Sequence, residues 1–223
     1  MSPIPFPVDE SDVVYLQHQW DDLLSPYPSD KSVKDNSFQK LIEKYSEQGR
    51  FYHNLSHIKS LLNLLESFHG KIQNPHAIIF SIWFHDVVYN PERNDNEEES
   101  ASLASETLEE LHVNRETIQC VKDLILATKT HRADNLSGDE QLFLDMDLAI
   151  LGMGEETYKK YSQAIRQEYS WVPEPTYRIS RKKILASFID RESIYFTDEM
   201  KKRFENQARK NISDEIKSLG SQF

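Results

Sequence analysis

Apolar residues recur three and four positions apart along most of this chain, the spacing that one face of an α-helix requires. The runs predict helices over residues 10–24, 33–48, 56–69, 75–89, 97–111, 114–129, 139–151, 154–170, 177–192 and 197–219. Ser56, Asn74-Pro75 and Asn114 are residue types that favour helix starts at the matching places. Alternating β-branched residues between turn clusters, the pattern of strands, are nearly absent. The sequence therefore predicts an all-α fold.

Nothing along the chain marks a boundary between two domains. The 223 residues contain no repeat, no low-complexity tract and no long linker, and only 6 glycines and 9 prolines interrupt the helical pattern. This length suits one domain or at most two. We expect a single helical domain over residues 1–223.

The charge balance limits the partners that the chain can have. Lysine and arginine number 26 against 37 aspartates and glutamates, which gives a net charge of −11. A nucleic-acid polymer or an anionic membrane requires a basic face, so both are disfavoured as main partners. A small-molecule substrate and a homo-oligomer both remain compatible with the sequence.

The apolar runs and the cysteine content favour a cytoplasmic protein. The longest nearly apolar run, 77–84, is far shorter than the roughly 20 residues that a membrane span needs. Residues 1–11 contain three prolines and no apolar core, unlike a signal peptide. The single cysteine, Cys120, excludes an internal disulfide, so nothing requires an oxidising compartment.

Two of the predicted helices carry histidine or aspartate where the pattern calls for apolar residues. His57 shares a helical face with Leu61, Leu64 and Phe68, and His85-Asp86 follows the apolar run 77–84. Burying such groups is costly unless they are paired or bind a metal. A hydrogen-bonded core histidine at His57 and a structural pair at His85-Asp86 are the simpler interpretations.

The segment 142–151 contains two further acids, Asp145 and Asp147. Two positions on a helix correspond to about 200° of rotation, so the two side chains face nearly opposite ways. The neighbours of Asp147 three and four positions away are all apolar, whereas Gln141 is among those of Asp145. We therefore expect Asp147 to be the interior carboxylate and Asp145 to be a solvated, capping or supporting acid at the edge.

Together these positions give a mixed nitrogen and oxygen donor set from three helices: His57, His85, Asp86 and Asp147. Such a set suits manganese, iron, cobalt, nickel or zinc, and magnesium also fits. Because the chain has no Cys-x-x-Cys motif, a sulfur-rich structural zinc site is excluded.

In their sequence context these residues resemble the HD-domain superfamily of predicted metal-dependent phosphohydrolases. The matching strings are RFYHNLSH at 50–57, WFHDVVY at 83–89, NEEESA at 96–101, ATKTH at 127–131, DMDLAILG at 145–152 and IRQEY at 165–169. The resemblance covers nearly the whole chain. It implies a compact helical bundle with its core at about 50–170 and the terminal helices packed on that core.

The resemblance also implies that His57, His85, Asp86 and Asp147 are the metal ligands. Dinuclear members carry extra histidines between the His-Asp pair and the last aspartate. Here Asn96 stands about where the first would be, and only His131 could supply another, so we expect one metal ion. Alarmone hydrolases have Glu-Asp where this chain has Tyr89-Asn90, which argues against that activity.

Two further histidines have open interpretations. His53 precedes His57 by four residues, but helix-starting residues lie between them, so we expect His53 to line the pocket or to be a structural loop residue. His131 continues one face of the predicted helix 114–129. It is a candidate phosphate donor or second-metal ligand, and a histidine at a helix C-terminus is the equal alternative.

The remaining candidates are charged residues. Glu97 and Glu98 fall in the first turn of a predicted helix, where acids favour the helix dipole, and one of them is a candidate to orient the attacking water. Arg50, Lys129 and Arg166 are candidates to neutralise phosphate, although exposed basic residues are the default interpretation.

The leading hypothesis is a metal-dependent hydrolase of a small phosphate ester such as a nucleotide, acting through a metal-activated water. Asp86 would hold the metal and help to take the water's proton. A di-iron oxygenase of HD type and a non-catalytic metal or nucleotide sensor are the two alternatives.

Overall fold

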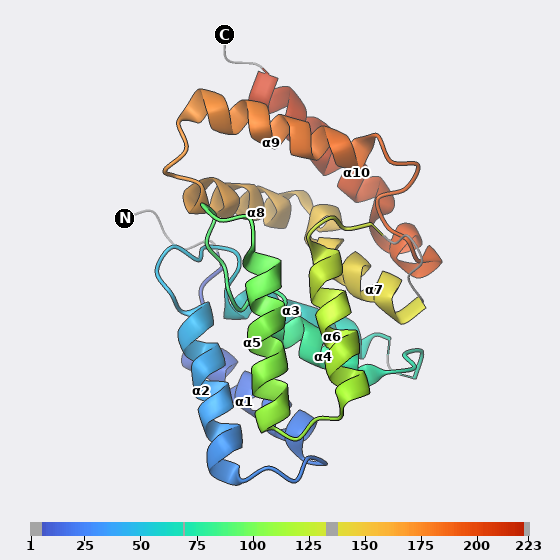
Figure 1. Cartoon of the computed structure of the whole chain (residues 1–223). Coiled ribbons are helices and arrows are strands. Elements are labelled where there is room, and N and C mark those ends of the chain that lie inside the picture. Colours follow the sequence, from blue (N-terminus) through green and yellow to red (C-terminus); the bar gives the residue numbers. More distant parts are fainter. Residues whose placement is uncertain (1–5, 69, 133–137, 221–223) are drawn as a thin grey trace.

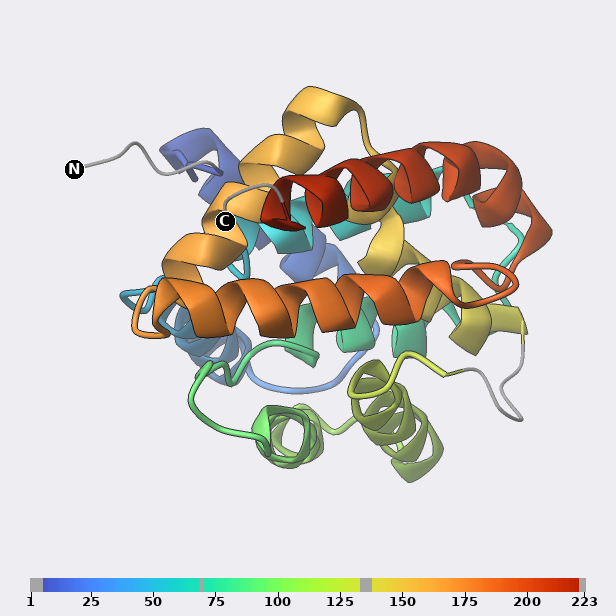
Figure 2. The ribbon, with the colours of Figure 1, turned by 90° about the horizontal axis from the view of Figure 1, so that it is seen from above.

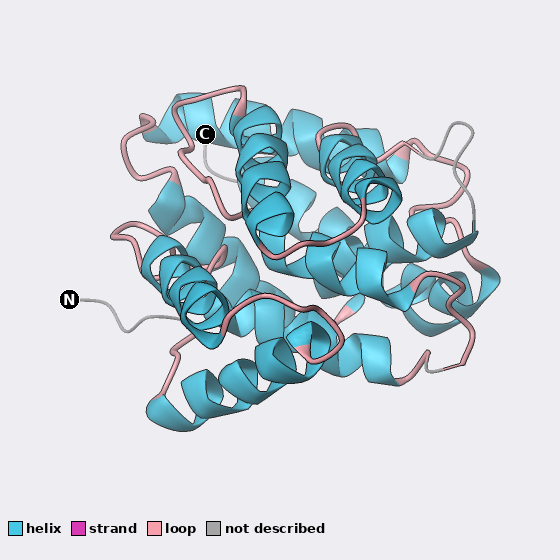
Figure 3. Ribbon diagram, turned by 60° about the horizontal axis from the view of Figure 1, so that its bottom comes forward, coloured by secondary structure: helices cyan, strands magenta, loops and turns pink. Residues whose placement is uncertain are grey.

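The computed structural model describes residues 6–68, 70–132 and 138–220. Over these residues the chain forms ten α-helices and one 3-10 helix, with no strand, so the predicted all-α fold is confirmed (Figure 3). The helices are α1 (Glu10–Leu24), α2 (Lys31–Tyr45), α3 (Leu55–Glu66), α4 (Pro75–Phe84), α5 (Asn96–Glu110), α6 (Arg115–Thr128), α7 (Gly138–Asp147), η1 (Leu148–Gly152), α8 (Glu155–Glu168), α9 (Glu174–Ile189) and α10 (Asp198–Gly220).

Helices α3 and α4 lie in the middle of the molecule, between two groups of helices. Figure 1 shows the antiparallel pair α5 and α6 in front, with α1 and α2 beside it, and α8, α9 and α10 across the top. Seen from above, α9 and α10 run side by side (Figure 2). The predicted single domain therefore has helices on every side of α3 and α4.

Helix α4 is apolar all round because it is surrounded by other helices. Its Phe80, Trp83 and Phe84 are fully buried and contact Trp20 of α1 edge-on, with ring centroids 5.3–6.1 Å apart. Such edge-to-face pairs are the favoured arrangement of buried aromatic rings. This aromatic cluster holds the end of α4, and therefore His85, in a fixed position.

Most predicted helix ends lie within three residues of those observed, and two differences bear on the site. The helix predicted to reach residue 89 ends at Phe84, and in the turn that follows the buried guanidinium of Arg50 donates to the carbonyl groups of Asp86 and Val87 at 2.7 and 3.0 Å. Asn54, rather than Ser56, caps α3, and its side chain accepts from the Ser56 amide at 2.9 Å.

The helix predicted over 139–151 is divided after Asp147, where the backbone tightens into the 3-10 helix η1. Gly152 ends η1 against α10, and a Cβ atom there would stand 2.5 Å from the Cβ of Phe204. This close approach fixes α10 on the segment that carries Asp147.

None of the described helices combines the length and the apolar character that crossing a membrane requires.

Candidate metal centre

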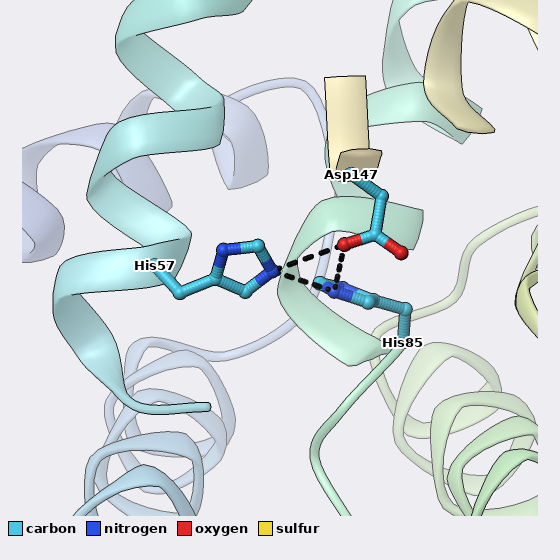
Figure 4. A group of neighbouring side chains, drawn as sticks. All are labelled: His57, His85 and Asp147. Atoms are coloured by element: carbon cyan, nitrogen blue, oxygen red, sulfur yellow. Dashed lines mark hydrogen bonds and ion pairs between the residues drawn. The ribbon is translucent and has the colours of Figure 1, made fainter. Parts of the chain in front are cut away.

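Four side chains from three segments converge between α3, α4 and α7. His57 lies in the first turn of α3, His85 caps the C-terminus of α4, Asp86 follows it, and Asp147 is the last residue of α7. Figure 4 shows the two imidazoles and the Asp147 carboxylate turned toward one another. These groups are far apart in sequence. The packing of α4, and the position of Asp147 directly before η1, bring them together.

The donor atoms stand close enough to share one ion. Nε2 of His57 lies 3.1 Å from Nε2 of His85, and Oδ1 of Asp147 lies 3.2 and 3.5 Å from the same two atoms. Oδ2 of Asp86 lies 3.0 Å from His85 Nε2 and 3.8 Å from His57 Nε2. Ligands about 2.1 Å from one metal stand about 3.0–3.4 Å apart in octahedral or tetrahedral geometry. Three of these residues, His57, His85 and Asp147, therefore form a group that could hold a divalent ion, and Asp86 lies beside it.

The hydrogen bonding of His85 favours the same conclusion. Its Nδ1 donates to the carbonyl oxygen of Ile82 at 3.0 Å, because that oxygen can only accept. Burial lowers the pKa of the His85 ring, but the carboxylates of Asp86 and Asp147 outweigh it and raise that pKa well above its ordinary value. A divalent ion would replace the proton on Nε2, the nitrogen that faces His57 and both carboxylates. A second-neighbour contact of this kind is the usual way in which proteins orient a metal-binding histidine.

The charges at the cluster favour a cation at its centre. Burial opposes ionisation of Asp147, but the imidazoles of His85, His131 and His57 outweigh it and hold the pKa of Asp147 well below its ordinary value. The pKa of Asp86 is likewise lowered, mainly by His85, against the effect of burial. Burial lowers the pKa of His57 and favours its neutral, ligating form.

Asp145 is the buried acid of this segment, which corrects the expectation that it lies at a solvated edge. Its side chain is fully buried, whereas that of Asp147 is 14% exposed. The Asp145 carboxylate accepts from the amides of Phe196 and Thr197 and from the Thr197 hydroxyl, each at 2.7 Å. Asp147, the predicted interior carboxylate, is the one that faces His57 and His85.

A cavity of about 490 Å³ opens beside Asp86 and Asp147. The other predicted residues on its wall are His53, Glu97, Lys129 and His131; the further lining residues are Tyr89, Arg93, Asn94, Asn96, Thr128, Tyr161, Ile165, Tyr169, Tyr177, Ser180, Arg181 and Ile184. Helices α8 and α9 supply its aromatic side. Two of the candidate metal ligands, Asp86 and Asp147, therefore lie at the wall of a space large enough for a small molecule.

His131 lies at the C-terminus of α6, the alternative position expected for it, and its ring contacts Asp147. Its Nε2 lies 2.8 Å from Oδ2 of Asp147, while its backbone amide donates to the carbonyl of Ala127 at the end of α6. The residue has a φ of 45°, in the left-handed region that ends helices. The ring thus reaches the oxygen of Asp147 that does not face His57.

Arg50 and Arg166, both predicted to contact phosphate, use their guanidinium groups within the fold instead. Arg50 is buried and donates to the carbonyls that end α4, and it is not on the cavity wall. Arg166 donates to Glu174 and to the carbonyls of Tyr169 and Val172 at 2.9, 2.6 and 3.1 Å. These contacts of Arg50 and Arg166 could not be predicted from the sequence, because the acceptors are mainly backbone carbonyl groups.

Lys129 remains on the cavity wall. Its ammonium group contacts the Glu98 carboxylate at 2.6 Å and lies 3.8 Å from that of Glu97. Glu97 also lines the cavity, whereas Glu98 is half-exposed outside it. Of the two acids predicted to orient water, only Glu97 is therefore in reach of the cavity.

Glu168 is a site residue that the sequence reasoning did not single out. Its carboxylate accepts from His53 Nδ1 at 2.7 Å and from the Tyr89 hydroxyl at 2.9 Å. A signal was present, since Glu168 continues the buried stripe of α8 that also contains Tyr161 and Ile165. An acid on an apolar stripe needs internal partners.

No family model matches the chain, and neither a curated protein nor a solved structure matches it.

Proposed function

We propose that this chain is a metal-dependent hydrolase that cleaves a phosphate ester of a small molecule. One observation carries the proposal: His57, His85 and Asp147 bring three donor atoms within 4.8 Å of one another, Asp86 lies beside them, and Asp86 and Asp147 are on the wall of a cavity. Imidazole and carboxylate ligands beside an open space are the donor set of hydrolytic metal sites, in which one position stays free for water.

The metal ion and the side chains of the protein would each supply part of the hydrolytic chemistry. A bound divalent ion supplies a coordinated water of lowered pKa and polarises a phosphoryl oxygen. Asp86 lines the cavity as an ionised carboxylate and is suited to orient a water molecule there by accepting its hydrogen bond, although its lowered pKa makes it a weak proton acceptor. Lys129 lies on the same wall, and its ammonium group would offset negative charge on the transferring phosphoryl group only after leaving Glu98 and the Asn94 carbonyl.

The cavity supports a small substrate rather than a polymer. Its volume of about 490 Å³ lies within the range typical of small-molecule sites. Four tyrosines, Tyr89, Tyr161, Tyr169 and Tyr177, lie on its wall and offer aromatic surface to a ring-containing substrate such as a nucleotide.

The test is metal analysis of protein purified without chelator, followed by a screen for phosphate release. Nucleotides, sugar phosphates and cyclic diesters are each offered with manganese, cobalt or nickel. We expect phosphate release that is lost in His57→Ala and His85→Ala but retained in His18→Ala, which changes an exposed histidine of α1. Circular dichroism checks that the variants keep their helical content.

Three outcomes contradict the proposal. Metal binding without turnover of any ester indicates a sensor. Two irons per chain together with oxygen consumption indicate an oxygenase, for which the contact between His131 and Asp147 offers a second ligand. Unfolding of both histidine variants, with no metal in the wild type, indicates a structural role for the cluster.

A further inference from the structure

Glu168 is a buried carboxylate outside the metal cluster that gathers five donors. Its Oε1 accepts from the backbone amides of Phe51, Tyr52 and His53 at 2.9, 2.7 and 3.0 Å. Its Oε2 accepts from His53 Nδ1 at 2.7 Å and from the Tyr89 hydroxyl at 2.9 Å. The residue is only 4% exposed, so these contacts replace its hydration.

The five contacts saturate the carboxylate. Burial favours the protonated form, but His53 and the amide donors outweigh it and lower the pKa of Glu168. An ionised carboxylate that already accepts five hydrogen bonds has little capacity left for a substrate. Any role of Glu168 in the cavity therefore acts through the groups that it holds, above all His53.

Two contacts fix the His53 ring. Nδ1 is held by Glu168, and the ring stacks on Tyr89 with centroids 4.2 Å apart and planes 27° apart. The hydrogen bond sets the rotation of the ring and the stacking sets its plane. Among the described residues Nε2 has no hydrogen-bond partner, and His53 lies on the wall of the cavity that Asp86 and Asp147 also line.

We propose that Glu168 is a positioning residue that orients His53 so that its Nε2–H donates a hydrogen bond to a phosphoryl oxygen of the bound substrate. The identity of that anion rests on the proposed function. The charged groups around the ring are Glu168 of α8, Asp86 after α4 and Asp147 of α7; Tyr89 is neutral. Burial opposes protonation, but the carboxylates of Glu168 and Asp86 outweigh it and raise the pKa of His53.

The test is Glu168→Gln, a change that keeps the shape of the side chain. The amide oxygen still accepts from the three backbone amides, whereas the amide nitrogen now offers a donor to Nδ1 of His53. In the wild type Nδ1–H donates to Glu168 and Nε2–H to the anion, so the ring carries a proton on both nitrogens. In the variant Nδ1 becomes an acceptor, so the ring keeps Nε2–H but loses its positive charge. We expect nitrogen-15 shifts of the His53 ring to report the loss of the Nδ1 proton, and the dissociation constant of inorganic phosphate with the zinc-loaded protein to rise by about 10–100-fold, because a charge-assisted hydrogen bond becomes a neutral one.

Glu205→Gln is the matched control, because Glu205 is likewise a carboxylate that accepts from backbone amides, those of Ile194 and Tyr195, but is not on the cavity wall. We expect its phosphate affinity to stay within about threefold of the wild type, well below the loss of a charge-assisted hydrogen bond. His53→Asn should lose as much affinity as Glu168→Gln. The double variant should lose no more than His53→Asn alone, because Glu168 acts through His53.

Several results would overturn the inference. A folded Glu168→Gln protein with unchanged phosphate affinity or unchanged His53 signals contradicts it. If Glu168→Gln does not fold, wild-type affinity in His53→Asn contradicts it equally. Phosphate binding that depends on His53, without hydrolysis of any ester, would refute the hydrolase and leave this inference standing. Hydrolysis with phosphate binding that is indifferent to both residues would refute this inference alone.

Discussion

Asp145 and Asp147, two positions apart on α7, show how the helix period separates two carboxylates. Asp147 faces the imidazoles of His57 and His85, whereas Asp145 points to the backbone amides that precede α10. The carboxylate oxygens of Asp147 therefore lie close to other donor atoms. Those of Asp145 are occupied by hydrogen bonds that join α7 to the segment before α10.

We predict that Asp147→Asn weakens metal binding by 10–100-fold or more, since even the loss of a ligand's supporting partner costs about that much. Asp145→Asn should leave metal affinity close to that of the wild type. It should lower the free energy of unfolding by about 1–3 kcal/mol, because the amide nitrogen meets the buried donors of residues 196 and 197. Metal titration of the apo proteins and urea denaturation measure the two effects side by side.

The opposite pattern, with metal lost in Asp145→Asn and retained in Asp147→Asn, would refute the assignment of Asp147.

For single residues, the sequence predicted which positions carry polar groups on apolar helix faces, but not all of the groups that these residues contact. His57, His85 and Asp147 stand out because their own helical neighbours are apolar. The burial of Asp145 could not be predicted, because its partner Phe196 lies 51 positions away and offers a backbone amide, which every residue type has. The carbonyl acceptors of Arg50 could not be predicted either, because they too are backbone groups.

Helices α7 and α10 meet through η1, where Gly152 allows the closest approach. An added Cβ would stand 2.5 Å from Phe204 Cβ and 2.7 Å from its carbonyl oxygen, so the α10 backbone would have to move. Because Asp145 also binds the start of α10, the position of α7 depends on this contact.

We predict that Gly152→Ala lowers the free energy of unfolding by about 1–3 kcal/mol through overpacking against α10. Gly154→Ala is the control, since a Cβ there meets nothing within 4 Å. Its effect should stay within about 0.5 kcal/mol, the usual range for surface substitutions. Urea denaturation of both variants compares them; equal destabilisation would contradict the packing argument.

Helices α8, α9 and α10 are joined by one buried ion pair. Arg181 of α9 contacts Glu215 of α10 at 2.9 Å, each with 8% of its side chain exposed, and the Tyr158 hydroxyl of α8 donates to the same carboxylate at 2.6 Å. Burial raises the pKa of Glu215, but Arg181 outweighs it, so the net pKa is below its ordinary value of 4.5.

A lowered pKa gives Glu215 a stabilising effect that is present above about pH 4.5 and is lost as the pH falls through the folded-state pKa. We predict that Glu215→Gln costs about 3 kcal/mol at pH 7, because it leaves the buried Arg181 charge without its partner. The difference from the wild type should shrink steadily below pH 4.5. Denaturation midpoints from pH 7 to pH 3 measure it, and a difference that stays constant would refute this account.

Helix boundaries were predictable where local signals begin the helix, as at the N-caps Asn74 and Asn114, whose side chains accept from Ala77 and Thr117. The early end of α4 was not predictable, and the turn that follows it is held by Arg50, which lies 36 positions before Asp86 and donates to its carbonyl group. Tertiary contacts of this kind leave no periodic trace in the sequence.

On the scale of the whole molecule, the candidate metal centre joins α3, α4 and α7 below a cavity whose opposite wall belongs to α8 and α9. An ion at this junction is held by segments that separate on unfolding, so it binds the folded state alone. Metal binding and global stability are therefore linked.

We predict that manganese or zinc at 100 times its dissociation constant stabilises the apo protein by about 2.7 kcal/mol. For a chain of this length that corresponds to a rise of roughly 5–10 °C in Tm, and a chelator should reverse it. Differential scanning calorimetry measures the shift. Asp147→Asn should show little of this rise in Tm. A wild-type Tm that changes with neither metal nor chelator would refute the metal site.

The contact between Glu168 and the Phe51 amide sets an order of events during synthesis. The two residues are 117 positions apart, which at about 5–20 residues per second separates their appearance by roughly 6–23 s. Until α8 emerges, the turn before α3 keeps its amides in water and His53 has only the ring of Tyr89 to orient it. The cavity thus matures in chain order: the metal-binding side chains are made first, the acceptor that aligns His53 comes later, and the α9 wall is made last.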